Sequence, residues 1–252
     1  MTQSTEIFTK TVDHYTKYRP SYPQEIIQLL INKKILAQNS VVADLGAGTG
    51  IFTKLLLEQG NIVYAVEPNQ AMRTAAELEL IRHPNFRSVA ATAEDTTLPG
   101  HSIDLITVAT AFHWIDASKA KTEFQRILKP SGYVALLWNV RDQENSALQR
   151  DYEHLLTKYA HNYKNQYENK FDLTKLENFF SPYIMHTNAF PYAQYFDWEG
   201  LKGRLLSTSY ALQSHEANFN IMIEELCNIY DKYQDHGKVK FLYRTMVYYG
   251  QL

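Results

Sequence analysis

The strongest constraint on the fold is an alternation of two hydrophobic patterns over the first 140 residues. Near-continuous apolar runs occupy 41–45, 62–66, 86–91, 104–109 and 133–138. Such runs are typical of parallel strands that are covered on both faces. Apolar residues recur at helical spacing in 24–36, 52–59 and 118–128. Strands that alternate with helices predict an α/β fold with a doubly wound, Rossmann-like sheet.

The pattern changes after residue 139. Helical spacing predicts a helix over 146–167, a short helix over 172–179 and an amphipathic helix over 216–233, and then 238–250 alternates as a final, antiparallel strand. We therefore expect residues 1–139 and 180–252 to form one domain and 140–179 to form a helical cap over its ligand. Plain packing of that segment on the core is the alternative.

Composition excludes several classes of protein. The chain has 252 residues, and its 25 Lys and Arg against 27 Asp and Glu give a net charge of −2, which offers no overall field for nucleic acid or anionic lipid. Its single cysteine cannot form an internal disulfide, and no histidine cluster has metal-ligand spacing. No apolar stretch approaches the roughly 20 residues of a membrane helix. The expectation is a cytoplasmic protein without metal, membrane or nucleic-acid partners; oligomeric state is not predicted.

A glycine-rich turn follows the first apolar run directly. Gly46, Gly48 and Gly50 precede a helical pattern that begins at Ile51. Glycines let a ligand approach the backbone, and a helix N-terminus offers unpaired N–H groups. A phosphate-binding loop would need Gly-Lys-Ser/Thr, which is absent, and the spacing G-x-G-x-G differs from the dinucleotide fingerprint G-x-G-x-x-G. NAD and FAD are therefore the weaker choice.

The second apolar run ends at Glu67. A carboxylate at the tip of the second strand can accept hydrogen bonds from both hydroxyls of a ribose that lies across the glycine turn. Stabilisation by the dipole of the next helix would be the structural alternative. Glycine turn and carboxylate together predict a nucleoside site without a polyphosphate.

The segments VVADLGAGTG, VYAVEP, AEDTTLP, DLITVATAFHW and ILKPSGYVALLWN, in this order, resemble the motifs of class I S-adenosylmethionine-dependent methyltransferases. The resemblance is to the small-molecule group, methyltransferase type 11, which includes trans-aconitate and ubiquinone-type enzymes. It extends from Phe8 to Asn139, and KFLYRTMVYYG resembles the last strand of that group. The resemblance implies a seven-stranded sheet and S-adenosylmethionine as cofactor, with S-adenosylhomocysteine as product.

The resemblance also implies cofactor roles. Asp44 would orient the glycine turn, Glu67 would bind the ribose, Met72 would pack on the adenine, and Arg19 would pair with the cofactor carboxylate. The group has an acidic residue at the position of Thr92, so here a hydroxyl, Glu94 or a backbone carbonyl would take its place. The whole implied set is Tyr18, Arg19, Asp44, Gly46, Ala47, Gly48, Glu67, Pro68, Met72, Thr92, Ala93, Glu94 and Ala109.

His113 follows the fourth apolar run, at the edge of the sheet where ligands bind. It is the candidate catalytic residue, because a histidine can take a proton from a hydroxyl or donate a hydrogen bond to a carboxylate. The alternative is that it only shapes the pocket beside Trp114. The Asn/Asp-Pro-Pro-Tyr/Phe motif of amide-nitrogen methyltransferases is absent here, which argues against that chemistry.

The candidate substrate residues are an aromatic and basic set. Arg141 and Arg204 could hold an acidic substrate, although each could equally be a structural ion-pairing residue. The chain has 18 tyrosines, most of them after residue 150, and an amphipathic pocket would use some of Tyr183, Tyr192, Tyr195 and Tyr210, together with Trp114. The predicted function is methyl transfer to oxygen of a small molecule. Transfer to carbon of a quinone-like aromatic, cofactor binding without catalysis, and RNA or protein methylation are the alternatives.

Overall fold

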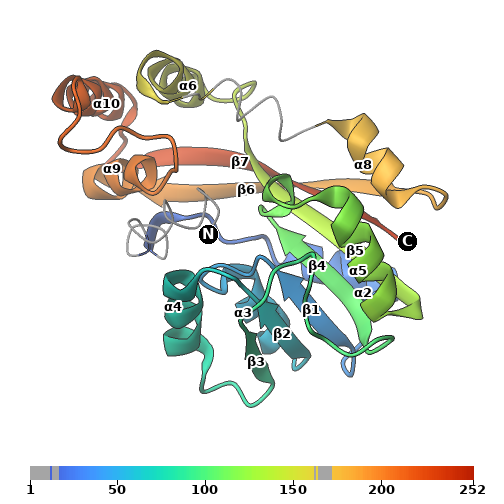
Figure 1. Cartoon of the computed structure of the whole chain (residues 1–252). Helices are drawn as coiled ribbons and strands as arrows, with labels where there is room; N and C mark the ends of the chain where they lie inside the picture. The colour runs from blue at the N-terminus through green and yellow to red at the C-terminus, as the bar shows by residue number, and fades with distance from the viewer. Residues whose placement is uncertain (1–11, 13–16, 162, 164–171) are drawn as a thin grey trace.

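The computed structural model describes residues 12, 17–161, 163 and 172–252. Its centre is a seven-stranded sheet in the order β3-β2-β1-β4-β5-β7-β6 (Figure 1). The strands are β1 (Val41–Leu45), β2 (Ile62–Val66), β3 (Phe86–Val89), β4 (Ile103–Ala109), β5 (Leu128–Arg141), β6 (His186–Phe196) and β7 (Val239–Gly250). Strands β1 to β5 pair in parallel, whereas β7 runs antiparallel to both β5 and β6. The predicted Rossmann-like α/β sheet with an antiparallel last strand is confirmed.

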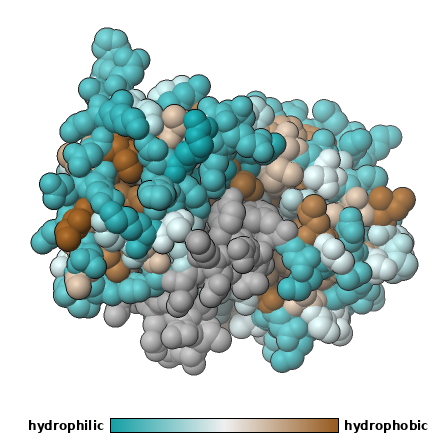
Figure 2. Space-filling view, turned by 90° about the horizontal axis from the view of Figure 1, so that it is seen from above, coloured by the Kyte–Doolittle hydropathy of each residue, from teal (hydrophilic) through white to brown (hydrophobic). Residues whose placement is uncertain are grey.

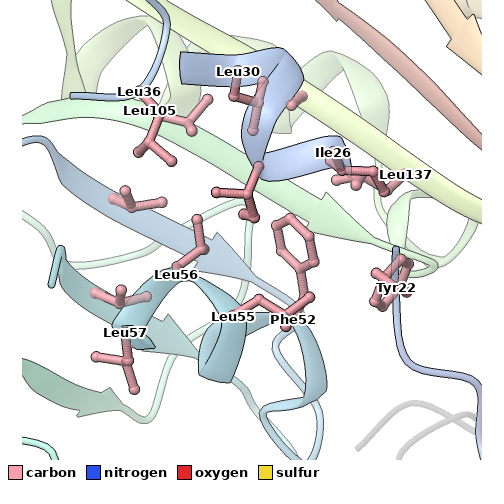
Figure 3. Close-up of a cluster of buried hydrophobic side chains, with 14 of the residues drawn as sticks. Tyr22, Ile26, Leu30, Leu36, Phe52, Leu55, Leu56, Leu57, Leu105 and Leu137 are labelled. Atoms are coloured by element: carbon pink, nitrogen blue, oxygen red, sulfur yellow. The ribbon is translucent and has the colours of Figure 1, made fainter. Parts of the chain in front are cut away.

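The helices of the first half cover both faces of the sheet. They are α2 (Glu25–Asn32), α3 (Ile51–Glu58), α4 (Gln70–Leu80) and α5 (Ala117–Ile127). The first core packs α2 and α3 against β1 and β4, and Figure 3 shows Tyr22 and Phe52 side by side there, with ring centroids 5.1 Å apart. On the other face, α5 packs against β4 and β5 together with α8 (Leu173–Phe180). Burial on both faces explains the continuous apolar runs of these strands.

A third hydrophobic core lies outside these two layers. It joins α6 (Ala147–Tyr159), α9 (Trp198–Leu206) and α10 (Phe219–Tyr233) to the ends of β6 and β7. Figure 1 shows the three helices gathered at one end of these two strands, while α8 lies beside α5. Packing therefore groups α6 with α9 and α10, which follow it by about 40 residues or more of chain, and separates it from α8.

Three elements differ from the sequence-based expectation. The pattern predicts no strand between 140 and 238, yet β6 pairs with β7 along its full length. Pro191 interrupts the strand signal, but proline is tolerated at a sheet edge, and β6 is an edge strand. The predicted 146–167 helix ends at Tyr159, and part of its remainder lies outside the described residues. Helix α9, which has two internal glycines, was not predicted at all.

No helix among the described residues is long and apolar enough to cross a membrane. The face of the molecule seen in Figure 2 is predominantly hydrophilic, with hydrophobic residues scattered over it. Because β1, β2, β4 and β5 run parallel, their carboxyl ends meet at one edge of the sheet. Open α/β sheets bind ligands at this edge.

Candidate functional site

The glycine turn connects β1 to α3 at this edge. Gly46, Gly48 and Gly50 have φ angles of 68°, 58° and 81°, in the left-handed region that glycine adopts without strain. A Cβ at Gly46 would lie 2.6 Å from the Cβ of Ala111, so packing demands that glycine. A Cβ at Gly48 would meet nothing within 4 Å. The backbone at Gly48 therefore faces open space in which a ligand can approach it.

Glu67 lies at the tip of β2 and holds the turn. Its Oε2 accepts a hydrogen bond from the Gly48 N–H at 2.9 Å, and its Oε1 accepts one from the Asn69 N–H at 2.8 Å. The residue is 9% exposed, and burial raises the pKa of its carboxyl, although these two bonds and the nearby Arg73 oppose the rise. Each oxygen keeps a second acceptor position. This carboxylate can therefore accept further donors beside the open backbone of Gly48.

Asp44 lies beneath the turn and is fully buried. Its Oδ2 accepts a hydrogen bond from the Thr53 hydroxyl at 2.6 Å, and its Oδ1 accepts one from the Thr107 hydroxyl at 2.8 Å. Burial raises the pKa of this carboxyl to about 6, even though both hydroxyls favour the charged form. The side chain thus joins β1 to the first turn of α3 and to β4, on either side of the glycine turn.

Asp44 should make stability depend on pH. Because the pKa of this carboxyl is about 6 in the folded chain and ordinarily 3.8, protonation of Asp44 favours folding. That contribution is complete below pH 3.8 and is lost as pH rises to about 6. Relative to Asp44→Asn, the wild-type chain should gain on the order of 2–3 kcal/mol of unfolding free energy between pH 7 and pH 4. Urea unfolding at both pH values measures this; a difference that does not change with pH would contradict it.

A pocket opens beside the glycine turn. Its walls come from the segment before α2, the turn and the start of α3, the end of β4, β5 and α9; they include Arg19, Tyr22, Gly46, Ala47, Thr49, Ala109, Thr110, Asn139 and Arg204. Among the described residues, the buried hydroxyl of Thr49 has no hydrogen-bond partner. Thr110 and Asn139 are pocket residues that the sequence analysis did not assign to the site. Thr110 has a left-handed φ of 56°, which no sequence pattern predicts.

The polar side chains of this wall are held in place. The hydroxyls of Tyr22 and Thr110 lie 2.9 Å apart. Asn139 Nδ2 donates to the carbonyl of Ser21 at 3.0 Å, and its Oδ1 accepts from the Thr245 hydroxyl at 2.5 Å. These bonds connect the segment before α2 to β4, β5 and β7, so residues distant in sequence form one wall.

The segment before α2, from which the resemblance implies that Tyr18 and Arg19 contact the cofactor, lies partly outside the described residues, which include neither 1–11 nor 13–16. Arg19 donates from Nη2 to the carbonyl of Ser207 at 2.7 Å. The ring of Tyr18 packs so closely on Gly203 of α9 that a Cβ there would overlap it. This segment is thus attached to α9, with Arg19 in the wall of the pocket.

The residues predicted for the adenine side follow β2 and β3. Pro68 and Thr92 are exposed, Ala93 is buried, and Met72 is buried in the first turn of α4. Glu94 accepts a hydrogen bond from the Asp116 N–H at 2.9 Å, just before α5. None of these residues lines the pocket described above, and their contacts with adenine remain a prediction.

His113 lies in η1 (Phe112–Trp114), directly after β4. It is partly buried, and its ring centroid is 5.0 Å from that of Trp114, which is 44% exposed. Both residues stand at the predicted edge of the sheet without lining the pocket. Their catalytic and substrate roles remain predictions.

The two predicted substrate arginines have different surroundings. Arg141 pairs with Glu153 of α6 at 3.1 Å and contacts the hydroxyls of Tyr163 and Tyr210. This setting supports its structural alternative. Arg204 lies in the wall of the pocket, and its Nε donates to the Tyr243 hydroxyl at 2.9 Å.

The four tyrosines proposed for a substrate pocket are spread apart. Tyr210 is buried against Tyr163, and Tyr192 packs on Tyr243 with ring centroids 6.1 Å apart. Tyr183 and Tyr195 are exposed. None of the four lines the pocket. Within the described ranges there is also no cluster of three or more histidine, cysteine or acidic residues that could hold a metal ion.

Comparisons with known proteins agree with this geometry. Residues 43–136 match the family model of a methyltransferase domain. An uncharacterised methyltransferase from Mycobacterium tuberculosis is 40% identical over 136 residues, which are 54% of this chain and 53% of the relative. The chain therefore spans about half the length of that relative. An uncharacterised methyltransferase from Geobacillus is 29% identical over 202 residues, covering 73% of this chain and 92% of that protein.

Solved structures show the same fold. A candidate type II methyltransferase from Anaeromyxobacter dehalogenans superposes with a TM-score of 0.66 at 18% identity, covering 93% of this chain and 98% of that chain. A candidate methyltransferase from an antibiotic biosynthesis pathway of Anabaena variabilis gives 0.63 at 24% identity, covering 94% and 100%. The comparisons thus show that residues 43–136 are similar to a methyltransferase domain, in a chain that shares the fold of solved methyltransferase structures.

Proposed function

We propose that this protein transfers the methyl group of S-adenosylmethionine to an oxygen of a small-molecule acceptor. The observation that carries the proposal is the open backbone at Gly48 beside the buried Glu67 carboxylate, which together suit a ribose. The cofactor's sulfonium supplies an already activated methyl group. The chain's own task is therefore to bind, to orient the acceptor and to exclude water.

The residues present fit this cofactor. Glu67 would accept hydrogen bonds from the ribose, Gly46 to Gly48 would lie along the methionyl part, and Ala109 would close the floor of the pocket. Arg19, which lines the pocket, would pair with the cofactor carboxylate. The proposed set also includes Tyr18, Asp44, Pro68, Met72, Thr92, Ala93 and Glu94. Asp44 would hold the turn from below.

We further propose that the group formed by α6, α9 and α10 is the cap. Its α9 lies on the pocket through Arg204 and on the amino-terminal segment through Gly203. The acceptor would lie between this cap and the sheet edge, where Tyr22, Thr110 and Asn139 supply donors and acceptors. This grouping revises the predicted 140–179 boundary, because α8 packs with α5.

We propose that His113 takes the proton from the hydroxyl group that receives the methyl group. Its expected contribution is about 10²- to 10⁴-fold in rate for a protonated nucleophile. A panel of hydroxy and carboxylic metabolites, screened for S-adenosylhomocysteine release, would first find the acceptor. His113→Ala should then slow turnover by that factor while cofactor affinity stays the same. Full turnover by His113→Ala would exclude this role.

Calorimetric titration with S-adenosylmethionine tests the proposal most directly. The chain should bind it; absence of binding at high micromolar concentration would remove both methyl transfer and simple cofactor binding. Binding without transfer to any acceptor would favour the cofactor-binding alternative. Transfer to carbon of an aromatic acceptor would instead be recognised in the product, where the methyl group forms a C–C bond in place of an ether or ester.

Gly48→Ala separates cofactor binding from folding. The new Cβ enters open space, so its folding cost is the left-handed strain of about 1–2 kcal/mol. Cofactor affinity should fall by more than this folding cost explains, because the new Cβ fills the space through which a ligand reaches the backbone. Gly60→Ala is the matched control, since Gly60 also has a positive φ and open space around a new Cβ but lies outside the site, so cofactor affinity should not change. Urea unfolding and calorimetry measure both effects. Wild-type affinity in Gly48→Ala would contradict the assignment.

A further inference from the structure

The interior beside the pocket holds two buried arginines with unequal partners. Arg141 and Arg204 are both almost entirely shielded from solvent. Glu153 pairs with Arg141 at 3.1 Å. Among the described residues, no carboxylate lies within ion-pairing distance of Arg204. No described carboxylate therefore neutralises the buried charge of Arg204.

The hydrogen-bond partners of the Arg204 guanidinium in the described part of the chain are neutral. Its Nε donates to the Tyr243 hydroxyl at 2.9 Å, and its Nη1 donates to the Ser207 hydroxyl at 3.4 Å. The side chain is 4% exposed, and burial lowers its pKa while neighbouring tyrosines raise it above the usual value. A guanidinium has five N–H donors and stays charged in proteins. A buried charge of this kind is costly unless an anion accompanies it.

The place where an anion can enter is the pocket, which Arg204 lines. Thr49 lines the same pocket, and its buried hydroxyl has no hydrogen-bond partner among the described residues. Ser207 connects Arg204 to a second cation, because its hydroxyl accepts from Arg204 and its carbonyl accepts from Arg19. Positive charge and an unsatisfied hydroxyl therefore meet in one concave site.

We propose that Arg204 binds a carboxylate in this pocket, an inference that rests on the proposed function because it takes the pocket to hold the cofactor, its acceptor, or both. A carboxylate matches the planar fork of a guanidinium in two parallel hydrogen bonds and cancels its charge. Two ligands could supply it: the methionyl part of the cofactor, or an acceptor that is itself a small carboxylic acid.

Calorimetry on the full chain tests the proposal and separates these two sources. S-adenosylhomocysteine is compared with its carboxamide, which keeps the nucleoside, the thioether and the amino group. Succinate, tricarballylate and citrate are each compared with their amides, in the presence and absence of the nucleoside. All titrations are made on the wild type, on Arg204→Gln and on Arg204→Lys, which keeps the charge but loses the fork.

The expected result is a loss of about tenfold or more in carboxylate affinity in Arg204→Gln, with less than about twofold change for the neutral counterpart. A loss confined to S-adenosylhomocysteine identifies the cofactor carboxylate; a loss confined to the acids identifies an acidic acceptor. Arg204→Lys should lie between the two, and circular dichroism checks that the variants fold. Arg244→Gln is the control, because that exposed guanidinium on β7 pairs with Glu144.

The proposal is wrong if Arg204→Gln lowers the affinity for acids and for their amides equally, or lowers neither affinity. It is also wrong if no carboxylate ligand binds the wild type more tightly than its amide does. Failure of the proposed function looks different. In that case the wild type binds neither S-adenosylmethionine nor S-adenosylhomocysteine, and the titrations with free acids still decide the role of Arg204.

Discussion

Glu67→Ala is expected to weaken binding of S-adenosylmethionine by about 1–3 kcal/mol, roughly 5- to 150-fold. The carboxylate would accept both ribose hydroxyls, and charge-assisted hydrogen bonds are among the stronger polar contacts. The substitution also releases the Gly48 N–H from Oε2, so the turn loses a support. Calorimetry measures the affinity, and urea unfolding shows how much of the loss reflects folding.

Two further variants make the result specific. Glu67→Gln keeps one acceptor oxygen and should lose less affinity than Glu67→Ala. Glu79→Ala removes an exposed carboxylate of α4 that pairs with Lys54 at 2.7 Å, and it should leave cofactor binding unchanged. Unchanged affinity in Glu67→Ala would argue against the ribose assignment, whereas equal losses in Glu67→Ala and Glu79→Ala would indicate a nonspecific charge effect.

Glu153→Gln should lower the free energy of unfolding by about 3–5 kcal/mol, the largest stability effect that we expect. Glu153 is the carboxylate that neutralises Arg141, and it also accepts a hydrogen bond from Tyr163. Without it, the buried Arg141 loses the carboxylate that pairs with it, and breaking a buried ion pair by removing one partner is costly. Urea unfolding monitored by circular dichroism measures the change.

The control is Glu144→Gln, because Glu144 pairs with Arg244 at 3.6 Å while 79% exposed, and such surface pairs contribute about 1 kcal/mol or less. The double variant Arg141→Met with Glu153→Leu should recover part of the lost stability, since it removes the charge together with its partner. A cost below about 1 kcal/mol for Glu153→Gln would mean that water or other groups compensate Arg141.

Much of the fold could be predicted because its signals are local. A strand buried on both faces needs a continuous apolar run, and β1, β2, β4 and the core of β5 each show one. The alternation in β7 is equally clear, since buried residues alternate with more exposed ones from Val239 to Val247. The sequence pattern does not predict β6, because most of this strand is only partly buried or exposed and Pro191 interrupts it. It is a strand because β7 offers a pairing edge, which depends on segments about 50 residues apart.

The candidate site divides in the same way. Gly46, Gly48 and Glu67 could be found in the sequence because a tight turn and a strand tip impose residue types at fixed spacing. Thr110 and Asn139 could not, because their place in the wall depends on hydrogen bonds to Tyr22, Ser21 and Thr245.

The arginines show the limit of sequence reasoning most plainly. By itself the sequence determined the alternating α/β architecture, the glycine turn with its carboxylate, and two arginines that either bind a substrate or form ion pairs. Only the tertiary structure placed Glu153 on Arg141 and left Arg204 with neutral partners in the wall of a pocket. The reason is physical: the partners of a buried charge come from other elements, and folding alone decides which of them it meets.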